Sequence, residues 1–301
     1  MLFGAQVRQA GGLLAALRRA EAMGAEVIQV FAQSPRQWRF PEANPDRAAG
    51  FGSAWPSSVI VRRVVCHAPY LVNLGSPDAE LYARSRRCPE DNLRAAGAMG
   101  AAGLVVHVGS HLGAGLDARL DAVADALVGA LDEVGPGATL LLENTAGAGG
   151  TIGRSFDELA RVIERAGGDR RLGVCLDTQH LWASGVPFGT IDEADRVVVA
   201  LDAAVGLDRL ACLHVNDSKV GFGSGVDRHE NPGEGTIGRA AFRALLGHPA
   251  LQDLPAVLEV PGTDDQGPSR RELGMVRRLH REGLALRAAG TTTTAGGGPR
   301  A

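Results

Sequence analysis

The sequence predicts an α/β protein built as a single (β/α)8 barrel, and three observations support this fold class. Eight short β-branched or apolar segments alternate with stretches whose apolar residues recur at helical spacing. A doubly wound open sheet usually carries a glycine-rich phosphate loop after its first strand, and Gly11-Gly12 forms no GxGxxG motif. The length of 301 residues also accommodates one barrel, which typically needs about 250 residues.

The predicted elements follow in order along the chain. Strands are expected at residues 3–7, 26–31, 63–67, 104–108, 139–143, 172–177, 210–215 and 256–260. The clearest helices are expected at 12–23, 117–134, 155–166, 192–205 and 270–282. Residues 41–58, assigned to the third crossover, mix proline, glycine and small residues and predict a short or poorly formed helix. Residues 1–289 would form one domain, and 290–301, which hold no apolar residue larger than alanine, a disordered tail.

Composition and charge exclude several classes of protein. A hydrophobic content of 45% and a charged content of 22% supply ample material for a core and exclude disorder for most of the chain. The sequence has no apolar run of membrane-spanning length and no signal-peptide pattern at its start, which predicts a cytoplasmic protein. The formal net charge of −3 gives no global basic signature for nucleic acid, although bound cations would create local positive potential.

Histidine and carboxylate residues fall at the ends of six successive predicted strands. In a barrel those ends meet at the face where active sites are built. Imidazole and carboxylate ligands without thiolate suit zinc, manganese or iron. A second group, His180, Asp227 and His229, follows in the loops after the sixth and seventh strands. The six residues at strand ends are His67, His107, Glu143, Asp177, His214 and Glu259.

These nine candidate ligands predict more than one metal ion. Zinc typically takes about four ligands, so a polynuclear site with a bridging carboxylate accounts for all nine. Clustered zinc ions are well suited to phosphoryl chemistry. The four cysteines form no CxxC pair, and they are expected to be reduced and buried. Cys175 and Cys212 lie two residues before Asp177 and His214, so they should face the barrel interior one layer below the metals as packing residues.

Several longer motifs include or flank the candidate ligands. They are Phe-Ala-Gln-Ser-Pro-Arg-Gln-Trp (31–38), His-Ala-Pro-Tyr-Leu-Val-Asn (67–73), His-Val-Gly-Ser-His (107–111), Glu-Asn-Thr-Ala-Gly (143–147), Leu-Asp-Thr-Gln-His (176–180), His-Val-Asn-Asp-Ser-Lys (214–219) and Asp-Arg-His (227–229), followed by Gly-Glu-Gly (233–235). Through these motifs, from Leu2 to about residue 285, the chain resembles the endonuclease IV family of apurinic/apyrimidinic endonucleases, whose barrel is xylose-isomerase-like.

The resemblance implies three zinc ions, which manganese or iron could replace in part. His67, His107 and Glu143 would hold the first, Glu143 would bridge to the second with Asp177, His214 and Glu259, and His180, Asp227 and His229 would hold the third.

The resemblance also implies an activity. Members of the family hydrolyse the phosphodiester 5′ to an abasic site in double-stranded DNA and leave a 3′-hydroxyl and a 5′-deoxyribose phosphate. They also trim blocked 3′ ends. The resemblance therefore implies a zinc-dependent deoxyribonuclease IV of the phage-T4-induced type. By similarity, a hydroxide bridging the first two zinc ions attacks phosphorus in line, and the third zinc stabilises the departing 3′ oxygen. Glu143 and Glu259 would orient or deprotonate this nucleophile.

DNA contacts follow from the same resemblance. Arg36 would insert into the duplex, and Tyr70 with Leu71 would fill the space left by a flipped-out nucleotide. Lys219 and Arg228 would contact phosphates beside the metals.

We expect a monomer, because the barrel encloses its own core.

Departures from the family pattern concern residues that would face DNA rather than metal. Gln6 and Arg8 stand where His and Ser are expected, Pro35 replaces a polar residue, Pro232 enters the loop after Asp227 and His229, and Glu259 is followed by Val260 instead of Thr.

Two alternatives remain open at this stage. A single-metal sugar isomerase or epimerase would need only Glu143, Asp177, His214 and Glu259, and would leave the other candidate ligands without a role. A non-catalytic damaged-DNA or scaffold protein should have lost ligands, and none is missing.

Overall fold

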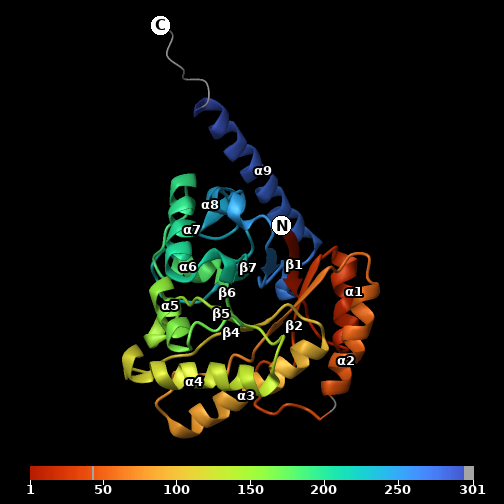
Figure 1. Ribbon diagram of the computed structural model, residues 1–301. Helices are drawn as coiled ribbons and strands as arrows, with labels where there is room; N and C mark the ends of the chain where they lie inside the picture. The colour runs from red at the N-terminus through yellow and green to blue at the C-terminus, as the bar shows by residue number, and fades with distance from the viewer. Residues whose placement is uncertain (43, 295–301) are drawn as a thin grey trace.

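A closed barrel of eight parallel strands forms the centre of the molecule, which confirms the predicted fold class (Figure 1). The computed structural model describes residues 1–42 and 44–294. Around the barrel the strands follow the order β1-β10-β7-β6-β5-β4-β3-β2, so only β1 and β10 close the ring across the two ends of the chain. The strands are β1 (Leu2–Gln6), β2 (Val27–Phe31), β3 (Arg63–His67), β4 (Leu104–Val106), β5 (Leu140–Glu143), β6 (Leu172–Asp177), β7 (Leu210–His214) and β10 (Pro255–Leu258).

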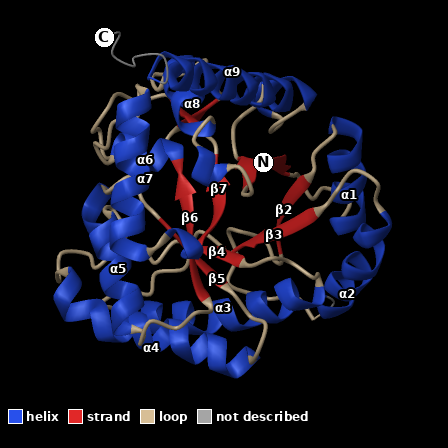
Figure 2. Ribbon diagram, turned by 45° about the horizontal axis from the view of Figure 1, so that its top comes forward, coloured by secondary structure: helices blue, strands red, loops and turns tan. Residues whose placement is uncertain are grey.

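Helices surround the strands as an outer ring (Figure 2). They are α1 (Leu13–Met23), α2 (Asn44–Ala54), α3 (Ala79–Ala98), α4 (Leu116–Val134), α5 (Phe156–Arg165), α6 (Thr178–Ala183), α7 (Ile191–Val205), α8 (Gly238–Leu246) and α9 (Arg270–Thr294). Short 3-10 turns add η1 (Trp55–Ser57), η2 (Ala148–Gly150), η3 (Leu207–Arg209), η4 (Pro249–Leu251) and η5 (Thr263–Asp265). A two-stranded antiparallel hairpin, β8 (Asp217–Ser218) with β9 (His229–Glu230), lies beyond the end of β7.

Local sequence signals fix where several helices begin. Asp78 caps α3 by accepting a hydrogen bond from the backbone N–H of Leu81 at 2.7 Å. Thr190 and Glu193 form a reciprocal capping box at the start of α7. Because these helices begin at defined residues, the loops between strand ends and helix starts are also fixed, and those loops carry part of the candidate site.

The expectation for residues 41–58 is wrong. These residues lie in the second crossover, between β2 and β3, and they contain the 11-residue helix α2. Ala48 and Phe51 of α2 are completely buried. Tertiary burial of an amphipathic face contributes most of a helix's stability, so this packing outweighs the weak local helix propensity.

The expected C-terminal boundary also changes. Helix α9 continues to Thr294, so residues 290–294, predicted to belong to a disordered tail, are helical. The remainder of that predicted tail, 295–301, lies outside the described residues. Within residues 1–42 and 44–294, no helix combines the length and the apolar character needed to cross a membrane.

Candidate metal centre

The candidate ligands at the strand ends lie in one layer inside the barrel. Side chains two residues apart on a strand point to the same face. The apolar layer below them consists of Val27, Val65, Val105, Leu141, Cys175, Cys212 and Val257. Two residues further along each strand come Gln29, His67, His107, Glu143, Asp177, His214 and Glu259. The period-two geometry of the strands therefore gathers six candidate ligands and one amide at the carboxyl end of the barrel.

Glu143 occupies the middle of this layer and is completely buried. Its Oε2 lies 3.2 Å from Nε2 of His67 and 3.3 Å from Nε2 of His107. Its Oε1 lies 2.9 Å from Nδ1 of His214 and 3.4 Å from Nδ1 of His180. One carboxylate thus faces imidazoles on both sides, which is the arrangement that a bridging ligand requires.

A second set of ligand atoms surrounds His214. Its Nδ1 lies 3.0 Å from Oε2 of Glu259 and 3.9 Å from Oδ2 of Asp177. With Glu143, these residues place four potential ligand atoms within 4.8 Å of one another. They come from β5, β6 and β7 and from the residue after β10.

The third set comes mainly from loops. Asp227 lies 3.2 Å from Nε2 of His180 and 3.1 Å from Nε2 of His229. His180 is placed by the short helix α6, because Asp177 caps that helix and accepts from the backbone N–H of His180 at 2.9 Å. Ligand atoms of Asp177, His180 and His229 also lie within 4.8 Å of one another. All nine candidate ligands are therefore adjacent.

The donor set fits metal ions. Nδ1 of His180 and Nε2 of His229 are buried and make no well-aligned hydrogen bond to any described residue, although carboxylate oxygens of Glu143 and Asp227 lie 3.4 Å and 3.1 Å away. A buried polar atom without a partner costs free energy, and a metal ion would satisfy both nitrogens. Four carboxylates and five imidazoles, with no thiolate among the nine, suit zinc, manganese or iron. The clusters could thus hold metal, as the sequence indicates.

Charge in the cluster is balanced between carboxylates and imidazoles. Burial alone would raise the pKa of the Glu143 carboxyl, but His107 and His214 outweigh burial and hold that pKa well below its ordinary value. Burial would lower the pKa of His214, but Glu259 and Glu143 raise it well above the usual value. In contrast, burial prevails at His107 and lowers its pKa. Metal ions would displace the bound protons, because only neutral imidazoles ligate.

Buried amides hold the carboxylates in place, and the sequence analysis did not identify them. Asn216 donates from Nδ2 to Oδ2 of Asp177 at 2.6 Å and accepts from the backbone N–H of Glu259 at 2.8 Å. Asn144 accepts from the backbone N–H of Asp177 at 2.7 Å. Both asparagines stand one or two residues after a candidate ligand, and this spacing is the signal that could have indicated them.

Gln29 is a further supporting residue at the same level. It donates from Nε2 to Oε1 of Glu259 at 2.6 Å and lies with its Oε1 2.9 Å from Nε2 of His214. Gln6, one of the departures from the family pattern, accepts from Nε2 of Gln29 at 2.9 Å. Its carbonyl therefore extends the hydrogen-bonded support around the candidate ligands.

Asp217 organises the loop that carries the third set. Its buried carboxylate accepts from the backbone N–H groups of Gly233 at 2.8 Å, Gly235 at 3.1 Å and Ile237 at 2.9 Å. Burial nevertheless raises its pKa. Pro232, another departure, directly precedes this anchored turn without displacing it.

Two of the candidate DNA contacts line an open cleft of about 770 Å³. Tyr70 and Leu71 line the cleft together with His107, Asp227 and Glu259. The Tyr70 side chain is 56% exposed, and its ring centroid lies 5.8 Å from that of His67. Its aromatic face is therefore available at the mouth of the site.

The basic candidates are exposed on neighbouring loops. Arg36 lies in the loop after β2, which is tied to the Tyr70 loop because the Tyr70 N–H donates to the carbonyl of Pro35 at 3.1 Å. Lys219 and Arg228 face each other across the hairpin, where the Lys219 N–H donates to the Arg228 carbonyl at 2.9 Å. Arg8 lies apart and contacts Gln266.

The closed barrel and its cluster of histidine and carboxylate side chains match a known class of TIM barrel. The sequence model of the family described as xylose isomerase-like TIM barrel matches residues 17–279. A curated relative from Methanoculleus marisnigri named "Probable endonuclease 4" is 38% identical over 280 residues, covering 93% of this chain and 99% of the relative. The crystal structure of endonuclease IV from Thermus thermophilus is 33% identical and superposes with a TM-score of 0.75, covering 95% of this chain and 99% of that one. The chain belongs to the endonuclease IV family.

A more distant comparison concerns the fold alone. The structure of an L-ribulose 3-epimerase superposes with a TM-score of 0.70 at 16% identity, covering 98% of this chain and 96% of the epimerase. Sugar epimerases and the endonucleases thus share one barrel, and only the site can separate the two classes.

Proposed function

We propose that this protein is a zinc-dependent DNA repair endonuclease that hydrolyses the phosphodiester 5′ to abasic sites and trims blocked 3′ ends. One observation carries the proposal: all nine candidate ligands of three ions converge, with Glu143 common to the first two sets and a ligand atom of Asp177 within 4.8 Å of those of His180 and His229. A single-metal epimerase would use four of them and leave five converging side chains without a role. Membership of the endonuclease IV family supports the nuclease as well.

Charge also favours a phosphodiester substrate. His67, His107 and Glu143 would hold one ion, Glu143, Asp177, His214 and Glu259 a second, and His180, Asp227 and His229 a third. Three divalent ions would outweigh the four carboxylates by two positive charges, although the whole chain carries −3. When bound, the ions would supply Lewis-acid stabilisation of phosphate oxygens and favour deprotonation of water.

The protein side chains have distinct tasks in this proposal. His214 and His67 oppose the effect of burial and hold the pKa of Glu259 at about 2, so its carboxylate is ionised at neutral pH. Glu259 also lines the cleft, so its ionised carboxylate can accept a hydrogen bond from a water molecule and orient it. Glu143 is completely buried and would act as the ligand shared by the first two metal sites.

DNA would be bound by the exposed residues around the cleft. Tyr70 and Leu71 would occupy the space opened by an extruded abasic nucleotide, since unstacked steps are stabilised by aromatic or apolar side chains. Arg36 would enter the duplex beside them, while Lys219 and Arg228 would neutralise phosphates next to the centre.

Cleavage of a duplex with a single abasic site tests the proposal. Purified protein would be assayed before and after chelation, with metal content measured on the same sample. We expect incision 5′ to the lesion, about three zinc ions per chain, and loss of activity after chelation. Glu164→Gln, at an exposed carboxylate on α5, is the matched control for changes at Glu143 and should cleave normally. No incision with a single labile ion would instead support a sugar isomerase, and no incision with three zinc ions would show that the substrate differs.

A further inference from the structure

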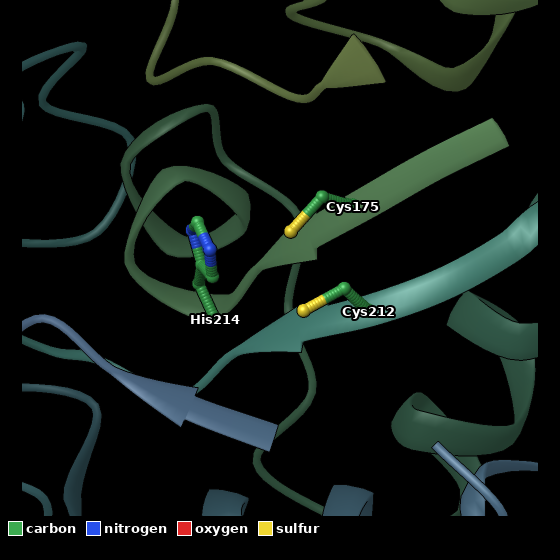
Figure 3. A group of neighbouring side chains, drawn as sticks. All are labelled: Cys175, Cys212 and His214. Carbon is green, nitrogen blue, oxygen red and sulfur yellow. The ribbon is translucent and has the colours of Figure 1, made fainter. Parts of the chain in front are cut away.

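A pair of thiols lies directly below the candidate metal centre. Cys175 on β6 and Cys212 on β7 are opposite one another in the register of these neighbouring strands. Figure 3 shows their thiols side by side, with His214 beyond them. One ligand atom from each of these three residues lies within 4.8 Å of the other two. The two thiols and the imidazole therefore form a separate group of potential metal ligands, which contains sulfur, whereas the ligand sets above contain only oxygen and nitrogen.

Core packing explains this pair only in part. The other members of the layer are valine and leucine, and all of them are buried. A β-bulge or irregularity shifts the register of β6 against β7 between Val174 and Cys175. Such irregularities re-aim side chains, and here the irregularity comes immediately before one of the two thiols. Cys66 and Cys88, in contrast, belong to the outer core and to none of the potential ligand groups among the described residues.

We propose that Cys175, Cys212 and His214 form a site for a soft, thiophilic divalent cation such as Cd²⁺, and that this ion inhibits the enzyme. Thiolate ligands select soft metals. Binding would release both thiol protons to solvent, and the two thiolates would then neutralise the charge of the ion. This neutralisation favours transfer of the ion into an apolar layer, where a hydrated hard ion would be poorly stabilised. Five of the candidate ligands line the cleft above, and the two thiols lie one layer below that level.

Inhibition follows from the shared imidazole. Nδ1 of His214 lies 2.9 Å from Glu143 and 3.0 Å from Glu259, so His214 belongs to the upper centre as well. Its other nitrogen, Nε2, lies 2.9 Å from Oε1 of Gln29, so an ion bound by the thiols would have to take one of the two ring nitrogens from its present partner and withdraw the imidazole from the upper centre. Cadmium at the lower site would therefore release zinc from the upper one.

The experiment adds Cd²⁺ to the zinc-loaded protein and measures thiolate-to-metal charge-transfer absorbance, bound metal and cleavage. We expect one Cd²⁺ per chain with a charge-transfer band, release of zinc, and at least a tenfold loss of activity. Cys175→Ala and Cys212→Ala should lack the band and retain their own activity at the same Cd²⁺ concentration. Cys66→Ala and Cys88→Ala, the matched controls, should respond like the unchanged protein.

Two results would overturn this site. One is the absence of a charge-transfer band when Cd²⁺ is added to the protein without substitutions. The other is a band and inhibition that persist in both Cys175→Ala and Cys212→Ala. If these variants fold poorly, ¹¹³Cd NMR of the unchanged protein still distinguishes sulfur ligands from nitrogen and oxygen ligands. The inhibition arm rests on the proposed nuclease function, whereas absorbance and NMR do not, so failure of either proposal is recognised separately.

Discussion

The carboxylate of Glu143 lies 2.9 Å from Nδ1 of His214, although 71 residues separate the two in the sequence. Strand β6 lies between their strands in the barrel, so neither backbone pairing nor a shared loop brings them together. They meet because both side chains point into the barrel at the same level. The relationship places one carboxylate between imidazoles from three strands, which makes Glu143 the most informative position to change.

Replacing Glu143 with glutamine is expected to abolish cleavage while the barrel remains folded. The amide keeps the size of the side chain but removes the charge that faces His67, His107 and His214. Activity on an abasic duplex, metal content and circular dichroism would be measured together, with Glu164→Gln as control. An active Glu143→Gln variant with full metal content would refute the bridging role.

Gln29→Leu tests whether the hydrogen bonds of Gln29 hold the neighbouring ligands in place. The hydrogen bond between Nε2 of His214 and Oε1 of Gln29, at 2.9 Å, selects the tautomer in which Nδ1 carries the free lone pair. Loss of such a partner typically costs about 10–100-fold in metal affinity or activity. Competition with a chelator would measure the affinity. Leucine has a similar size but leaves the buried polar groups of Gln6, Glu259 and His214 without this partner, so the melting temperature should also fall. An unchanged zinc affinity would contradict this role.

Metal affinity should rise with pH between about 6.5 and 9. Burial lowers the pKa of His229, but Asp227 and Asp177 outweigh it and raise that pKa to about 9 in the metal-free protein. Zinc must displace this proton, so affinity should increase by up to about tenfold per pH unit for each such histidine. Titrations against a chelator across this window provide the measurement. Equal affinity at both ends would show that His229 is not a ligand.

The stability of the metal-free protein should fall as the pH rises, whereas metal affinity should increase. A histidine whose pKa is raised in the folded state stabilises that state below its unfolded pKa, about 6.5. The stabilisation is lost as the pH rises through the folded pKa of about 9. The melting temperature of metal-free protein should therefore fall from about pH 6.5 to 9. A melting temperature that rises over this range would contradict the assignment.

Most of the strand-derived site was predictable because strands have a strict period. A buried apolar residue followed two positions later by a polar one, as in Val65 and His67, marks an inward-facing side chain at a strand end. Gln29 follows Val27 in the same way, but an amide carries no metal signal and was overlooked. The loop residues His180, Asp227 and His229 were grouped from their place after the sixth and seventh strands, and the family resemblance then assigned them to a third ion.

Features that depend on tertiary contacts were not predictable. Helix α2 forms because Phe51 packs into the core, a contact that local composition does not show. The role of Asp217 arises from backbone N–H groups more than fifteen residues away, in a turn whose path the sequence does not specify. In both cases the determining partner is distant in the chain.

Gly235→Ala is expected to disturb the loop that carries the third set of ligands. A Cβ atom at Gly235 would lie 2.4 Å from the carbonyl oxygen of Ser218 and 2.5 Å from Oδ1 of Asp217. Backbone would have to shift, at a cost of about 1–3 kcal/mol. Urea unfolding and zinc content would both be measured. Gly221→Ala, where an added Cβ meets nothing within 4 Å, is the control, and equal behaviour of the two variants would contradict this account.

Lys219→Gln and Arg228→Gln should each weaken DNA binding and reduce its dependence on salt. A side chain that neutralises one phosphate releases counterions, so its loss lowers the slope of log affinity against log salt by about 1. The effect should be similar on damaged and undamaged duplexes, because phosphate contacts carry no sequence or lesion information. Arg170→Gln removes an exposed charge at the opposite end of the barrel, before β6, and should leave the slope unchanged. If Lys219→Gln and Arg228→Gln also leave it unchanged, the DNA backbone does not pass over the β8–β9 hairpin.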